Sequence, residues 1–143
     1  MSIVQTATTN FKIGLLDGTF NFDTGTTQTF KIALYTANAD LNASTTAYTT
    51  SGEVVGTGYT AGGQTLTISQ VPTSTGTVAY LSFSDVSWPS STLTARAALI
   101  YKYDGSTNPA VAVLDFGSDK TSTTTFQVQF PAATTSSAII RIA

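Results

Sequence analysis

The sequence predicts an all-β fold, an antiparallel two-sheet sandwich that is jelly-roll-like, with about eight short strands and at most a short N-terminal helix. Threonine, which favours strands, occurs 29 times and serine 15 times. Charged residues make up only 10% of the chain, so hydroxyl groups must keep the surface polar. Apolar residues mostly alternate with polar ones, which is the pattern of a strand with one buried face.

The expected elements follow one another with turn residues between them. Residues 11–16 (FKIGLL) carry apolar side chains before an Asp-Gly pair and predict a helix of barely two turns. Clusters of Gly, Pro, Asn or Ser separate most of the later apolar segments, and no helix-length pattern lies between them, which favours antiparallel pairing. The predicted strands are residues 30–36, 64–70, 78–83, 94–103, 110–116, 125–130 and 138–143.

A chain of 143 residues is the size of one domain. We expect residues 1–10 to form an N-terminal arm and residues 11–143 to form a single β-sandwich domain. The arm is polar and Thr-rich except for Ile3 and Val4. It is expected to become ordered only on binding, as a strand added to a neighbouring molecule. Residues 36–50 have a similar composition and predict a long loop suited to contact a neighbour.

The composition excludes several kinds of chemistry. Without cysteine or histidine the chain has no disulfide, no thiolate nucleophile, no imidazole base and no zinc site made from these side chains. All the acidic residues but one are Asp, and several flank turns, so neither a glycosidase carboxylate pair nor a calcium site at Asp17, Asn21 and Asp23 is expected. We therefore expect no enzymatic activity, no cofactor and no metal.

Charge and hydropathy also bear on the partners. A net charge of −2 offers no basic stripe for a phosphate backbone, so nucleic acid is not an expected partner. No segment reaches the roughly 20 apolar residues of a membrane span, and the N-terminal residues do not have the pattern of a secretory signal. We expect no membrane association.

A few side chains are candidates for contacts with a partner. Trp88 stands next to Pro89 at a predicted loop, where an exposed contact anchor and a core position are equally well supported. Arg96 and Lys102 lie six residues apart on one predicted strand and are expected to share a face. Tyr101 and Tyr103 alternate with Lys102, which predicts a phenolic face at the end of that strand. Ile3 and Val4 of the arm complete the set.

Together, several segments resemble a recurrent small virion protein of tailed bacteriophages. The resemblance covers about four-fifths of the chain, from residue 30 onward. It lies in FKIALYT (30–36), SGEVVGTGYTAGGQTL (51–66), LSFSDVSW (81–88), LTARAALIY (93–101), AVAVLDFGSDK (110–120), FQVQFPA (126–132) and AIIRIA (138–143).

The resemblance implies a non-enzymatic structural protein similar to the jelly-roll cement, or decoration, proteins of phage capsids. It implies attachment to the outer surface of the head, with the major capsid protein and further copies of the chain as partners. It also implies synthesis in the cytoplasm of the bacterial host. The alternative is a tail or fibre module that binds a host glycan, with Trp88, Tyr101 or Tyr103 stacking on a sugar.

Overall fold

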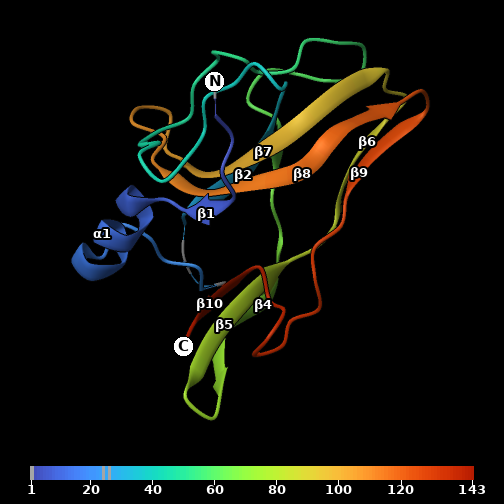
Figure 1. Ribbon diagram of the computed structural model, residues 1–143. Helices are drawn as coiled ribbons and strands as arrows, with labels where there is room; N and C mark the ends of the chain where they lie inside the picture. The colour runs from blue at the N-terminus through green and yellow to red at the C-terminus, as the bar shows by residue number, and fades with distance from the viewer. Residues whose placement is uncertain (1, 24, 26) are drawn as a thin grey trace.

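The computed structural model describes residues 2–23, 25 and 27–143, and it is an all-β sandwich with one short helix (Figure 1). Strands hold 48% of the chain and the helix 6%, which confirms the predicted fold class. In chain order the elements are β1 (Thr6–Ala7), α1 (Thr9–Asp17), β2 (Thr29–Tyr35), β3 (Gln64–Thr65), β4 (Ile68–Thr75), β5 (Val78–Phe83), β6 (Val86–Pro89), β7 (Leu93–Tyr103), β8 (Ala110–Ser122), β9 (Thr125–Val128) and β10 (Ile140–Ile142).

The first layer is a five-stranded antiparallel sheet in the order β1-β8-β7-β2-β3. Its centre is formed by β2, β7 and β8, in which Ile32 pairs with Ile100 and Leu99 pairs with Val113. All four side chains are fully buried although neighbouring positions point to opposite faces, so this part of the sheet is covered on both sides.

The second layer consists of a three-stranded sheet, β10-β5-β4, and a two-stranded sheet, β6-β9. In Figure 1 the two-stranded sheet leads from the far ends of β7 and β8 toward the β4–β5 hairpin below. The two sheets of this layer and the five-stranded sheet all contribute side chains to the core between the layers, which we call the inter-sheet core. Its larger members are Phe11, Phe20, Phe22, Phe30, Ile32, Leu34, Leu81, Phe83, Trp88, Leu93, Ile100, Val111, Leu114, Phe126 and Val128.

The other face of the five-stranded sheet is covered by the chain that follows β2, and this corrects the expectation of a loop directed at a neighbour. Leu41 and Ala39 are fully buried there, and the ring of Tyr48 stacks on that of Tyr101 with centroids 4.9 Å apart. Residues 36–50 contain few apolar side chains, but several of these pack against the sheet. We call this second cluster the loop-side core; it contains Ala33, Tyr35, Ala39, Leu41, Ala97, Leu99, Tyr101, Ala110 and Val113.

The described part of the N-terminal arm, residues 2–10, is paired within its own chain, so the expectation that it waits for a neighbour is wrong for this structure. The Val4 amide donates to the Leu41 carbonyl at 2.9 Å, and β1 pairs with β8. Thr8 is fully buried, and its hydroxyl oxygen accepts the Phe11 amide at 3.0 Å as the N-cap of α1. The helix therefore begins at Thr9, before the domain boundary expected at residue 10.

We predict that Trp88→Ala lowers the free energy of unfolding by about 3–5 kcal/mol, because it opens a cavity at a side chain that is only 2% exposed. Val55→Ala is the matched control, since Val55 is 96% exposed and its truncation should change stability by no more than about 0.5 kcal/mol. Urea unfolding followed by circular dichroism measures both. Similar values for the two variants would contradict the packing described here.

Candidate docking surface

Two of the expected contact residues, Trp88 and Tyr101, lie in the interior. Trp88 is an inward-facing residue of β6, between the rings of Tyr59 and Phe126 at 6.1 and 6.2 Å. Tyr101 is 1% exposed, and its hydroxyl donates to the Gly62 carbonyl at 2.6 Å. The exposed-anchor interpretation of Trp88 is therefore wrong, because the predicted loop at this position is a short strand with alternating burial.

Arg96 and Lys102 do not share a face, which corrects the expectation from their spacing. The register of β7 against β8 shifts between Ala95 and Ala97. As a result Ala95 belongs to the inter-sheet core, whereas Ala97 belongs to the loop-side core. Lys102 pairs with Phe30 on the inter-sheet side. A regular period of two cannot be carried through such an irregularity.

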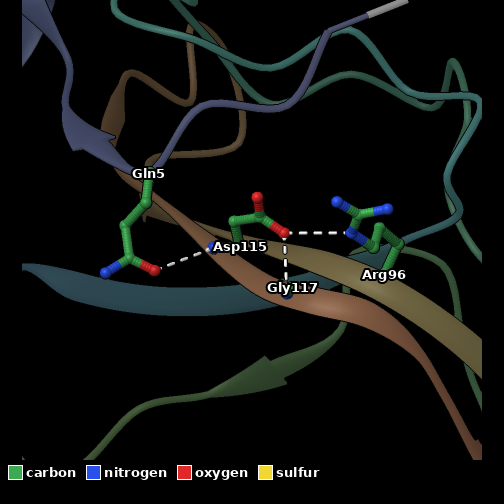
Figure 2. A network of polar contacts seen from close by, with 4 residues as sticks. All are labelled: Gln5, Arg96, Asp115 and Gly117. Atoms are coloured by element: carbon green, nitrogen blue, oxygen red, sulfur yellow. Dashed lines mark hydrogen bonds and ion pairs between the residues drawn. The ribbon is translucent and has the colours of Figure 1, made fainter.

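Arg96 instead belongs to a polar network with Asp115, Gln5 and Gly117 (Figure 2). Its Nε donates to Asp115 Oδ1 at 3.0 Å, and the Gly117 amide donates to the same oxygen at 2.8 Å. The Asp115 amide donates to Gln5 Oε1 at 3.0 Å. The Gly117 bond, and next the Arg96 bond, hold the pKa of the Asp115 carboxyl below its ordinary value. The network thus joins β7, β8 and the segment before β1.

Of the remaining predicted residues, Ile3 and Val4 lie in the segment before β1, and Tyr103 lies at the end of β7. Ile3 packs against the loop-side core, while Val4 and Tyr103 are about half exposed. The ammonium of Lys31 lies 4.7 Å from the ring centroid of Tyr103, a cation–π contact between the neighbouring strands β2 and β7. Tyr101 and Tyr103 follow each other on the same side of β7, as expected. The fold does not bring the seven predicted residues into one surface.

A buried carboxylate, Glu53, was not singled out by the sequence. Its Oε1 accepts from the Tyr59 hydroxyl and from the Gly62 amide, both at 2.7 Å, and its Oε2 accepts from the Tyr48 hydroxyl at 2.6 Å. Burial and the bonds to Glu53 raise the pKa of Tyr48 and Tyr59 well above the usual 10. Burial, and next the Glu53 charge, raise the pKa of Tyr101 to about 12. The phenols therefore stay protonated and act as donors.

The Glu53 cluster is a structural clamp. Gly63 lies directly on β2, where a Cβ would overlap the Ile32 carbonyl, and Gly62 lies beside the Tyr101 hydroxyl. Both glycines have positive φ, which favours glycine, and the close approach of Gly63 to β2 leaves no room for a side chain. Because Glu53 binds the segments around Tyr48 and Gly62 together, its charge fixes the loops that cover the second face of the sheet.

An exposed apolar surface lies on α1 and β10, and the sequence interpretation did not identify it. Leu16 is 91% exposed, and Ile13 and Ile142 are more than half exposed. On the other side of the helix, Phe11 and Gly14 are buried. The sequence did contain a signal for this surface. The large apolar residues of this short helix are Phe11, Ile13, Leu15 and Leu16, and these four positions cannot all face the same core.

A groove of about 860 Å³ runs beside this apolar surface. It lies between β1 and β8 on one side and β10 on the other, with α1 along it. Its lining residues include Ala7, Phe11, Leu15, Leu16, Ala112, Leu114, Ile139, Ile140 and Ile142, together with Lys12 and Arg141. Contiguous exposed apolar surface is typical of sites that contact a protein or a ligand. We call it the α1–β10 groove.

The carboxylates at turns hold their own backbone. Asp104 accepts hydrogen bonds from the amides of Asn108 and Ser106 and from the Thr107 hydroxyl, and these bonds lower its pKa. Asp17 accepts from the amide and hydroxyl of Thr19. Over residues 2–23, 25 and 27–143, no group of three or more acidic side chains is placed to hold a metal ion. Within the same ranges, no helix is long and apolar enough to cross a membrane.

Comparisons with known proteins give no relative for this chain. No protein-family model matches it, and neither a curated protein nor a solved structure is significantly similar.

We predict that Glu53→Gln lowers the free energy of unfolding by about 1–3 kcal/mol, because the amide NH₂ faces donors and leaves one of them unpaired. Asp40→Asn is the matched control, since Asp40 is an exposed acid and its variant should stay within about 0.5 kcal/mol of wild type. Chemical denaturation at neutral pH measures both. Equal stabilities would show that the clamp contributes nothing.

Asp115 should make stability depend on pH. Its folded pKa lies below the unfolded one, so its contribution is present above the ordinary carboxyl pKa and is lost as the pH falls through the lower folded pKa. We expect Asp115→Asn to be less stable than wild type by about 0.5–1 kcal/mol at neutral pH, with the difference vanishing in acid. Paired urea titrations across this pH range test it. A difference that is constant with pH would contradict the role of the charge.

Proposed function

We propose that this chain is a non-enzymatic structural protein of a tailed-phage particle, which binds the outer surface of the head as a cement protein and stabilises it. The observation that carries the proposal is the exposed apolar surface of α1 and β10 beside the α1–β10 groove. A helix with apolar residues on its outer side is normally covered by another element. In a cement protein that element belongs to the shell.

The resemblance of several segments to small virion proteins supports the same function. Low charge fits it as well, because few charged groups must lose water when a large contact forms. The two-sided burial of β2, β7 and β8 gives a rigid body that keeps its shape on a particle. Because many copies would attach at symmetric positions, even modest contacts would together stabilise the particle substantially.

The non-enzymatic part of the proposal is supported by how the acidic side chains are engaged. Both oxygens of Glu53 accept hydrogen bonds from neighbouring donors, and Asp115 is paired with Arg96. Asp104 and Asp17 fix turns through several bonds each. Carboxylates in these roles are acceptors within the fold.

The alternative, a tail or fibre module that binds a host glycan, depends on exposed aromatic rings. Trp88 and Tyr101 are buried in this fold. Tyr103 is exposed, and Lys31 lies over its ring. A single such ring is a small platform for a sugar, so the alternative ranks second.

Cryo-electron microscopy of virions from a phage that encodes this sequence tests the proposal. We expect density for the chain on the outer head surface, and particles that carry Leu16→Glu should lose this density, because the charge is placed in the proposed contact. Val55→Glu is the matched control, an equally exposed apolar residue away from the groove. Density along the tail would favour the alternative, and undiminished decoration by Leu16→Glu would overturn the assigned surface.

A further inference from the structure

The α1–β10 groove lies between two sheet edges. β1 is the last strand of the five-stranded sheet, and β10 is the last strand of the three-stranded sheet. Among the described residues each of them pairs with one strand, β8 and β5 respectively. One backbone edge of each strand is therefore left without a strand neighbour, and a sheet edge of this kind binds extended chains by adding a strand.

The edge of β10 is the better template. On β1 the Thr6 hydroxyl already donates to the Ala7 carbonyl at 3.0 Å, and the preceding Gln5 is held by the Asp115 amide. No backbone hydrogen bond of residues 139–143 is formed outside the pairing with β5 in the described chain. Beside β10, the apolar side chains of Leu15 and Leu114 line the groove. An added strand would thus place alternate side chains on an apolar floor.

The charged side chains of the groove indicate which kind of segment it binds. Its two charged side chains are both cationic, Lys12 and Arg141, and no Asp or Glu is among its lining residues. Neither cation forms an ion pair with a described residue, and the Arg141 guanidinium donates only a long, 3.4 Å bond to the Thr135 carbonyl. Two cations above an apolar floor are complementary to an apolar segment that carries a carboxylate.

We propose that the α1–β10 groove binds an extended segment of the partner protein, apolar at alternate positions and carrying an acidic side chain, as a strand added to β10. The inference rests on the proposed function and gives the chemistry of the docking segment on the shell. Backbone bonds to β10 would supply the docking geometry, the floor would take the apolar side chains, and Lys12 and Arg141 would select for the acid.

A blocked peptide serves as the probe: acetyl-Ser-Val-Thr-Val-Asp-Val-Thr-Ser-amide, titrated into isotope-labelled protein and followed by NMR. We expect shift changes confined to β10, α1 and the groove side of β1 and β8. The same peptide with Lys in place of Asp should bind at least about threefold more weakly. No shift changes at millimolar peptide, changes centred elsewhere, or equal binding of the two peptides would overturn the proposal.

Charge reversal gives the decisive comparison. The double variant Lys12→Glu and Arg141→Glu should prefer the Lys peptide, whereas Lys120→Glu, an exposed cation outside the groove, should keep the wild-type preference. An unchanged preference in the double variant would also overturn the proposal. Its failure is distinct from failure of the proposed function, because head decoration in virions is scored separately by microscopy with the wild-type chain.

Discussion

The structure depends on a three-stranded ladder, β2-β7-β8, whose side chains are buried on both faces. Because the apolar side chains on both faces must be shielded from water, one face is covered by the second layer and the other by loops. The inter-sheet core meets the first need with aromatic side chains from both layers. The loop-side core meets the second, and the Glu53 clamp holds that cover in place.

One of the two register shifts between β7 and β8 decides which polar side chains meet on the surface. The register shift near Ala97 places Arg96 beside Asp115 and leaves Lys102 on the opposite face. Asp115 then accepts the Gly117 amide within the irregular stretch of β8. Gln5 occupies the neighbouring amide, so the segment before β1 is attached where strand pairing ends. Local backbone geometry, more than residue spacing, sets which polar groups meet.

Four of the seven large apolar side chains that are exposed in the described chain lie on α1 and β10. α1 covers the inter-sheet core with Phe11, but Ile13 and Leu16 lie on the side of the helix that faces away from this core. β10 closes the second layer with three residues and leaves Ile142 at the rim of the groove. α1 and β10 are both short and lie at the same end of the sandwich, where they leave apolar side chains uncovered. Under the proposed function, a partner covers this surface.

The sequence by itself determined the fold class, the positions of most strands and the short helix, because these follow from local periodicity and turn residues. It also limited the chemistry, through the absence of Cys and His. Only the tertiary structure decided that Trp88 and Tyr101 are interior, that residues 2–10 pair within the chain and that Glu53 is a buried clamp. Exposure and side-chain pairing depend on contacts between distant segments and on register shifts, and neither leaves a periodic trace in the chain.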